Sequence, residues 1–223
     1  MKTIKSGLPV LLLLCSVAAA REAVSPNGAW SMTVPESWEP VELGDKNSVQ
    51  TGVHSFWKAP EDENKFSDYL MVTVLEQTLH VTAAGREDFR QKLQAELNED
   101  KRMQAGIEKV EVAKIADRDA YRVEGFLIAP NGTPMKNVKW YVPTGERVYV
   151  FSFTAPGATF PYKLPAFETM AQSIRMKEAA PAPPGREADW RGAVAIFGVL
   201  VAIVCAVGVL VIARKQFRAA TET

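Results

Sequence analysis

The chain has 223 residues, of which 47% are hydrophobic and 23% are charged, with 26 basic and 26 acidic residues. This balance excludes the strongly basic surface of a nucleic-acid-binding protein, so we expect no nucleic-acid partner. The two cysteines, Cys15 and Cys205, lie in the two terminal apolar runs. The sequence between those runs therefore has no thiol for a disulfide or for a cysteine-based metal site.

Residues 1–20 have the features of a secretory signal peptide. Two lysines form a basic start, a short apolar core follows, and the alanines at 18–20 offer a small-residue cleavage site before Arg21. The apolar core is too short to cross a bilayer, which takes about 20 apolar residues. When the two lysines leave with the signal, the 26 basic residues fall to 24, against 26 acidic ones. We predict that cleavage leaves a mature chain with a small negative charge.

Residues 21–177 are predicted to form one extracytoplasmic globular domain that is rich in strands. Short runs with alternating apolar residues are bounded by Pro, Gly or Asn, which is the pattern of half-buried strands and their turns. Asn131-Gly132 and Thr144–Glu146 are typical of hairpin turns. The predicted strands are Trp30–Val34, Val53–Lys58, Tyr69–Glu76, Ile107–Ile115, Ala120–Ala129, Met135–Val142 and Arg147–Thr154.

Two helices are predicted within this domain. Between Thr82 and Met103 the period changes, and the spacing of Phe89, Leu93 and Leu97 places them on one helical stripe. Gly106 is interpreted as the stop signal of this helix. The second helix covers about 160–173, and its apolar face consists of Phe160, Leu164, Phe167, Ala171 and Ile174.

The predicted order is β-β-β-α-β-β-β-β-α. Consecutive strands with short turns form antiparallel pairs, and an apolar sheet must be covered by other elements. The fold class is therefore α+β: a mainly antiparallel sheet covered by two helices, as an α/β/α sandwich.

Four motifs in this order resemble those of the PsbP-like superfamily, which includes the DcrB-like bacterial envelope proteins. They are Trp30–Trp38 (WSMTVPESW), Asp119–Val123 (DAYRV), Val148–Ala155 (VYVFSFTA) and Phe167–Ile174 (FETMAQSI). The resemblance covers nearly all of residues 28–176. It implies an α/β/α sandwich that acts in binding or assembly, and it implies no enzymatic activity.

The C-terminal part has the pattern of a membrane anchor. Residues 178–190 form a Pro/Ala-rich linker, which is typical of a stiff, extended spacer. Residues 191–213 are predicted to form a transmembrane helix, because 192–213 is apolar and carries no charge. Basic residues begin the short tail, 214–223, and positive charge favours the cytoplasmic side. We therefore predict a single-pass, type I membrane protein.

Small residues recur at every fourth position of the predicted anchor, at Gly198, Ala202 and Ala206. Such a stripe lets two membrane helices approach closely, so these residues are a candidate helix–helix contact and a transmembrane homodimer is a possible assembly. Gly and Ala are also common in membrane helices without any such role.

The domain carries no motif of a known catalytic, metal or cofactor site. Its two histidines, His54 and His80, are isolated, whereas a histidine metal site takes two or three imidazoles at defined spacing. There is neither a Gly-x-Ser-x-Gly elbow nor a phosphate-binding Gly-rich loop. The acidic run Glu61–Asn64 is interpreted as a solvated turn rather than a calcium loop. We therefore assign no catalytic, cofactor-binding or metal-binding residue, and we expect no cofactor.

Aromatic residues lie mainly on the predicted strands. Alternation places Tyr149, Phe151 and Phe153 on one face of their strand. Packing in the core is the favoured interpretation, and an aromatic platform for a ligand is the alternative.

Together these features predict a membrane-anchored, extracytoplasmic binding or assembly protein without catalytic activity. The alternative is an envelope module that binds a small molecule or a lipid, which the aromatic strands favour. We expect the chain in the cell membrane, with its domain outside the cytoplasm, periplasmic or extracellular, and its C-terminus inside. The expected partners are the lipid bilayer and another protein of the envelope.

Overall fold

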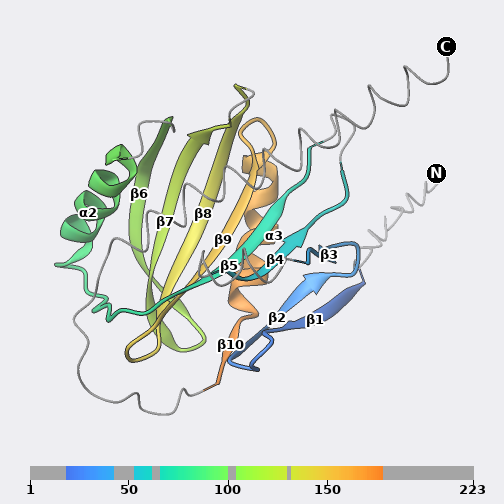
Figure 1. Cartoon of the computed structure of the whole chain (residues 1–223), viewed down its shortest axis with the longest axis horizontal. Helices are drawn as coiled ribbons and strands as arrows, with labels where there is room; N and C mark the ends of the chain where they lie inside the picture. Colours follow the sequence, from blue (N-terminus) through green and yellow to red (C-terminus); the bar gives the residue numbers. More distant parts are fainter. Residues whose placement is uncertain (1–18, 43–52, 62–65, 100–103, 130–131, 178–223) are drawn as a thin grey trace, which may run out of the picture.

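The domain contains two antiparallel sheets, of which the large one lies at its centre and the small one at its side (Figure 1). The structure is a computed structural model, and it describes residues 19–42, 53–61, 66–99, 104–129 and 132–177. A small sheet has the strand order β1–β2–β10, and a large seven-stranded sheet has the order β3–β4–β5–β9–β8–β7–β6. The strands are β1 (Ala20–Val24), β2 (Trp30–Pro35), β3 (Glu39–Pro40), β4 (Val53–Lys58), β5 (Tyr69–Leu75), β6 (Gln104–Ile115), β7 (Arg118–Ile128), β8 (Pro134–Pro143), β9 (Val148–Pro156) and β10 (Arg175–Met176).

Strands β6 to β9 form a meander of long hairpins. The β6–β7 turn places Ala116 and Asp117 at positive φ, 50° and 62°, and a pair of left-handed residues matches the twist of a two-residue hairpin. Gly145 in the β8–β9 turn has φ +77°, a conformation that glycine adopts without steric cost. The meander then joins the earlier strands because β9 pairs with β5 along its length.

Helix α2 (Arg86–Glu99) begins with two acidic residues, Glu87 and Asp88, which interact favourably with the positive end of the helix dipole. Its buried residues, Phe89, Leu93 and Leu97, are spaced four apart, as a single packing stripe requires. The helix packs along β6. Figure 1 shows it at the edge of the large sheet that β6 forms.

Helix α3 (Phe160–Gln172) lies behind the large sheet in Figure 1. A proline is tolerated in the first turn, where the backbone N–H has no partner inside the helix, and Pro161 occupies that turn. Pro165 lies inside the helix. Phe167, Met170 and Ala171 turn inward onto β8, β9 and β2.

The two helices cover opposite faces of the large sheet. Trp140 and Phe151 belong to the main core, which also contains the buried side of α3 and the β2 residues of the small sheet. Their neighbours Tyr141 and Val150 belong to a second cluster with Phe89 of α2. Successive strand residues point to opposite faces, so α3 and the small sheet form one outer layer and α2 forms the other.

The antiparallel sheet with two helices confirms the predicted α+β class. All seven predicted strands and both predicted helices are present, with ends shifted by a few residues. Tyr149, Phe151 and Phe153 share a face and are buried in the main core, as the favoured packing interpretation predicts.

Several details of the predicted secondary structure were wrong. Strands β1, β3 and β10 were not predicted, because two of them have only two residues and β1 overlaps the predicted cleavage site. Gly106 is not a helix stop but lies within β6. A Cβ at Gly106 would come within 2.6 Å of the Phe126 ring on β7, so a larger residue there requires this ring, which is 38% exposed, to shift.

Within the described residues, no helix is long and apolar enough to cross a membrane. Residues 1–18 of the predicted signal peptide, the linker 178–190, the predicted transmembrane helix 191–213 and the tail 214–223 lie outside the described residues. Their prediction from the sequence therefore stays a prediction.

Candidate functional site: a polar cluster on the sheet

The two faces of the large sheet differ in their chemistry. The face toward α3 is covered by one continuous apolar core with Trp140, Phe151 and Phe153 among its buried residues. On the face toward α2, the apolar residues divide into three separate clusters. Four polar residues on the central strands β8 and β9 point to this second face: Asn137, Lys139, Ser152 and Thr154. We call them the sheet-face cluster.

Pairing between β8 and β9 brings the four together. Asn137 lies opposite Thr154, and Lys139 lies opposite Ser152. Residues directly opposite on an antiparallel pair have Cβ atoms about 4.5–5.5 Å apart, and the two pairs are successive on the same face. All four are buried, with exposures of 3% for Asn137, 5% for Lys139, 3% for Ser152 and 8% for Thr154. The cluster is therefore a compact polar group inside a largely apolar layer.

Lys139 is the charged member of the cluster. Burial lowers the pKa of its ammonium group to about 7, because water no longer stabilises the positive form. Near neutral pH this lysine is therefore close to the point at which its charge changes. An anionic group placed beside it would stabilise the protonated form and raise that pKa again.

Ser152 and Asn137 add hydrogen-bonding capacity beside the lysine. The buried Oγ of Ser152 has no hydrogen-bond partner among the described residues. A buried polar atom without a partner costs about 1–3 kcal/mol, so such atoms in native proteins call for an explanation. Next to Asn137 the sheet carries Gly125, where a Cβ would lie 3.4 Å from the Asn137 Oδ1 and 2.7 Å from the backbone oxygen of Gly106. The glycine thus keeps the space beside the amide free.

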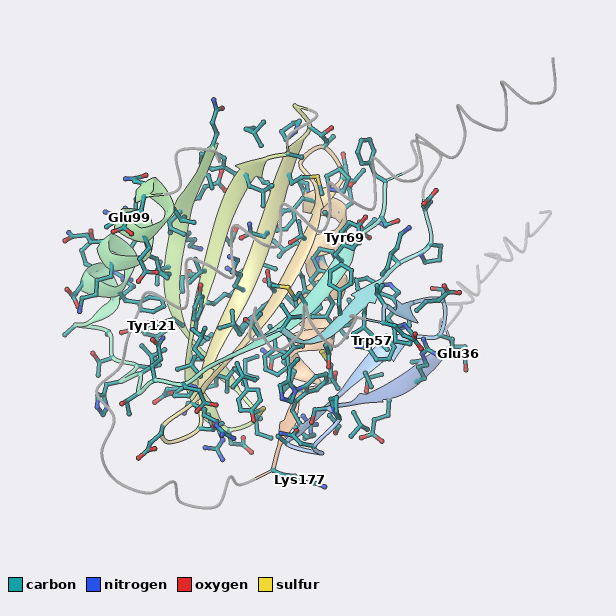
Figure 2. All side chains as sticks on the ribbon, viewed as in Figure 1. Glu36, Trp57, Tyr69, Glu99, Tyr121 and Lys177 are labelled. Atoms are coloured by element: carbon teal, nitrogen blue, oxygen red, sulfur yellow. The ribbon has the colours of Figure 1, made fainter. Side chains whose placement is uncertain are left out.

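Apolar residues flank the cluster on the β5 side. Met71 lies opposite Ser152, and Tyr69 lies opposite Thr154. Tyr69 stacks on Phe56 of β4 with ring centroids 5.4 Å apart, and Phe56, Met71 and Val53 form a small cluster of their own. Figure 2 shows Tyr69 on this side of the sheet, with Tyr121 far across it toward α2.

The other flank is closed by α2. Phe89 stacks on Tyr121 at 4.4 Å and meets Tyr141 edge-on at 5.1 Å. Tyr121 also donates a hydrogen bond to the backbone oxygen of Thr82, at 2.9 Å, which ties the segment before α2 to β7. Aromatic packing therefore already fills the sheet surface beneath the first turns of the helix.

Glu96 of α2 contributes a carboxyl group at this flank. Burial, and secondarily the neighbouring Glu99, raises the pKa of Glu96 to about 7. Burial, and secondarily the charge of Glu96, raises the pKa of Tyr141, which follows Lys139 on the same face of β8. The sheet face thus holds one acid and one base that both titrate near neutral pH.

A second charged group, on the opposite face, has a structural role. Arg122 donates to Glu111 at 3.1 Å, to Glu124 at 2.6 Å and to Glu168 at 2.8 Å. Its guanidinium also lies 5.8 Å from the centre of the Trp140 ring. These contacts join β6, β7 and α3, and they engage both terminal nitrogens of the guanidinium.

The residues singled out in the sequence do not form this site. Gly198, Ala202 and Ala206 lie outside the described residues. His54 lies in β4 and contacts the Tyr149 ring edge-on, while His80 is exposed in the connection that precedes α2. In the part of the chain that the structure describes, no group of three or more His, Cys, Asp or Glu side chains could hold a metal ion.

Sequence reasoning missed the sheet-face cluster although its signal was present. Ser152 and Thr154 alternate with Phe151 and Phe153, and Lys139 directly precedes Trp140. A strand with polar residues on one face is predicted to have that face exposed to solvent. The burial of that face follows from the tertiary structure.

Comparison with solved structures identifies the fold. The solution structure of cyanobacterial PsbP (CyanoP) from Synechocystis sp. PCC 6803 is similar with a TM-score of 0.54 and 13% identity, over 73% of this chain and 95% of that chain. The Ran-binding protein Mog1p of Saccharomyces cerevisiae is similar with a TM-score of 0.46 and 12% identity, over 71% of this chain and 96% of that chain. LpqN of Mycobacterium tuberculosis, which is involved in cell envelope biogenesis, has a TM-score of 0.45 and 13% identity, over 71% of this chain and 91% of that chain.

No family model matches the sequence, and no curated protein matches it either. The chain has the PsbP-like fold, as the motifs in its sequence predicted. At these identities the likeness concerns the fold, and function must be argued from the site.

Proposed function

We propose that the chain is a membrane-anchored, extracytoplasmic binding or assembly protein without catalytic activity. The observation that carries the proposal is the sheet-face cluster, in which buried donor groups lie between apolar patches. An amide, an ammonium and two hydroxyl groups in one place form a set that recognises a polar group by hydrogen bonds. The predicted signal peptide, linker and transmembrane helix support a place in the cell envelope, with the domain outside the cytoplasm.

The proposed partner is another protein of the envelope. The linker would hold the domain at a distance from the bilayer, where it could reach this partner. The test uses the full chain in the membranes of its source, with a photo-crosslinking amino acid at Tyr69, beside the cluster. A matched variant carries the same amino acid at Tyr162, which is 84% exposed on α3, the helix that covers the opposite face.

A protein adduct that forms at position 69, and that Lys139→Met abolishes, would support the proposal. Adducts that form equally at positions 69 and 162, or that persist in Lys139→Met, would contradict binding at the cluster. If position 69 yields no adduct with any molecule, the binding function itself is contradicted.

A second candidate function is the binding of a small molecule or a lipid. It is favoured by the stacked Phe56 and Tyr69 and by Met71, which give the polar cluster an apolar neighbour. In the same crosslinking experiment this function predicts an adduct of low mass at position 69, detected by mass spectrometry of the intact chain.

A further inference from the structure

We infer that the outer face of the small sheet docks the domain on the bilayer, by holding the phosphate–amine headgroup of a membrane lipid in a hollow beside Lys177. This inference rests on the membrane anchoring in the proposed function and does not depend on the sheet-face cluster. The observations behind it are the hollow, the charges around it and the place where the chain leaves the domain.

The hollow lies on the side of the small sheet that faces away from the core. Cross-strand register places Val24, Ser31 and Arg175 in one row across β1, β2 and β10. Trp30, the neighbour of Ser31, belongs to the main core, so the row points outward, because successive strand residues alternate between faces. The row borders a hollow of about 280 Å³. Pockets for drug-sized ligands have roughly 300–1,000 Å³, so this one suits a headgroup rather than a whole lipid.

The charges around the hollow have both signs. Its lining includes Glu22 of β1, Arg175 of β10 and Lys177 directly after β10, and all three are exposed. Strands β1 and β10 lie on either side of β2, so the acid and the bases are separated by two strand spacings of about 4.8 Å each. Among the described residues no ion pair joins them. This arrangement fits a ligand with an anionic group for the two bases and a cationic group for Glu22.

Backbone contacts hold the two bases at the hollow. The Nη1 of Arg175 donates to the backbone oxygens of Gln172, at 3.1 Å, and Ile174, at 2.9 Å. The backbone N–H of Lys177 donates to the oxygen of Ala29 at 2.9 Å. A Cβ at Gly28 would lie 3.3 Å from the Lys177 Nζ, so the ammonium lies against the β1–β2 turn. Phosphate oxygens accept short, strong hydrogen bonds from such groups.

An exposed apolar side chain lies beside these charges. Val24 is 54% exposed and lines the hollow from β1. Apolar residues next to basic ones are typical of surfaces that lie in the headgroup region of a bilayer, where the apolar atoms leave water while the charges meet the headgroups. Val24 therefore favours a lipid in the membrane over a free phosphate compound.

The hollow lies at the point where the chain leaves the domain toward the predicted anchor. Lys177 is the last described residue, and Figure 2 shows it at the end of β10. Only the predicted linker 178–190 separates it from the predicted transmembrane helix. Such a tether raises the effective concentration of headgroups at the site, so a weak site is sufficient. An extended linker can lie along the bilayer as well as stand away from it, which makes docking compatible with a spacer.

The test uses the full chain in nanodiscs of phosphatidylcholine, mixed with either phosphatidylethanolamine or phosphatidylglycerol. A fluorescent amino acid replaces Pro26, which is exposed in the β1–β2 turn, and a lipid with a nitroxide on its headgroup quenches it. The matched position is Tyr162, which is 84% exposed at the start of α3, the helix end away from β10. We expect stronger quenching at position 26 than at 162, and more docking with phosphatidylethanolamine than with phosphatidylglycerol.

Lys177→Gln should lower the ratio of docked to free domain about 5-fold, as expected for one cation near lipid phosphates. Glu22→Gln should abolish the preference for phosphatidylethanolamine over phosphatidylglycerol, because it removes the partner of the amine. The matched control is Lys92→Gln, since Lys92 is an exposed lysine of α2, which Figure 1 shows across the molecule from the small sheet. This control should dock like the wild type.

Equal quenching at positions 26 and 162, unchanged docking by Lys177→Gln, or equal docking on the two lipid mixtures would overturn the inference. Free glycerophosphoethanolamine separates the two sources of the headgroup. If it releases the domain at concentrations below that of the lipid headgroups, the site serves a soluble compound and docking is also overturned. A chain that does not comigrate with the nanodiscs contradicts the membrane anchoring, and docking with it. A chain that comigrates without selective quenching at position 26 contradicts docking alone.

Discussion

At the scale of single residues, two largely buried cations, Arg122 and Lys139, differ in their surroundings. Arg122 has a side chain that is 11% exposed and three carboxylate partners, whereas Lys139 is buried beside hydroxyl and amide groups. The guanidinium therefore joins parts of the fold, and the ammonium lies in the candidate site. This difference leads to opposite expectations when each charge is removed.

Removal of the Arg122 charge should destabilise the domain. Arg122→Met leaves Glu111, Glu124 and Glu168 close together without a cation, and we expect the free energy of unfolding to fall by about 2 kcal/mol. This is less than the 3–5 kcal/mol lost when a fully buried pair is broken, because the carboxylates are partly exposed. Urea unfolding followed by tryptophan fluorescence measures it. Lys92→Met, which breaks the exposed pair with Asp88 on α2, is the control and should cost less than about 0.5 kcal/mol.

Glu96 should make the stability depend on pH. Its pKa is raised from 4.5 to about 7, so the folded state holds a proton that the unfolded state releases. Stability from this group is therefore fully present below pH 4.5 and is lost as the pH rises toward 7. The shift corresponds to about 3 kcal/mol for a fully shielded group, and we expect roughly 1 kcal/mol because Glu96 is only half buried.

Glu96→Gln removes this titration. The variant should match the wild type at pH 4.5 and exceed its stability by roughly 1 kcal/mol at pH 8. Unfolding curves of both proteins at the two pH values measure the difference. A stability difference that is the same at pH 4.5 and pH 8 would show that Glu96 does not titrate as stated.

At the scale of elements, α3 holds the apolar face of the large sheet to the small sheet. Phe167 is 1% exposed, and its ring meets Phe153 at 5.3 Å and Trp38 at 6.4 Å. Phe167→Ala should therefore cost about 3–5 kcal/mol, through lost burial and the cavity left behind. Tyr162→Ala, on the same helix but 84% exposed, should stay within about 0.5 kcal/mol of the wild type. Equal losses for the two variants would contradict the assignment of the inner face.

The short strand β1 ties the start of the predicted mature chain to the domain. Arg21 donates a hydrogen bond to the backbone oxygen of Trp38 and lies 5.1 Å from the centre of the Trp57 ring. Cleavage before Arg21 would leave β1 paired with β2 from the Arg21–Val34 pair onward. The first residue of the mature protein would then be anchored by its side chain.

At the scale of the whole molecule, the proposed topology can be checked directly. The test uses cells from which the layers outside the cytoplasmic membrane have been removed, while that membrane stays intact. Added protease should digest an epitope tag placed within the linker 178–190. A tag after Thr223 should be protected, since basic residues at 214–218 favour the cytoplasmic side. N-terminal sequencing of the membrane-bound protein should begin at Arg21. Protection of the linker tag, or an uncleaved N-terminus, would contradict the type I arrangement.

Seven strands and both helices of the domain could be predicted from the sequence, because the evidence for these elements is local. Strand alternation, the 89–93–97 stripe and the turn glycines each act over a few neighbouring residues, and these elements appear where predicted. The four motifs also indicated the PsbP-like fold through their order along the chain.

The strand pairing and the candidate site could not be predicted from the sequence, because both depend on residues that lie far apart along the chain. Strands β3 and β10 have two residues each and exist because a longer strand lies beside them, and no local pattern encodes that neighbour. In the sequence, Lys139 and Ser152 are simply polar residues of two different strands. The register between β8 and β9 places them opposite each other on a buried face. Burial then turns an ordinary lysine into a group that titrates near pH 7, because desolvation depends on what surrounds a side chain and not on its position in the chain.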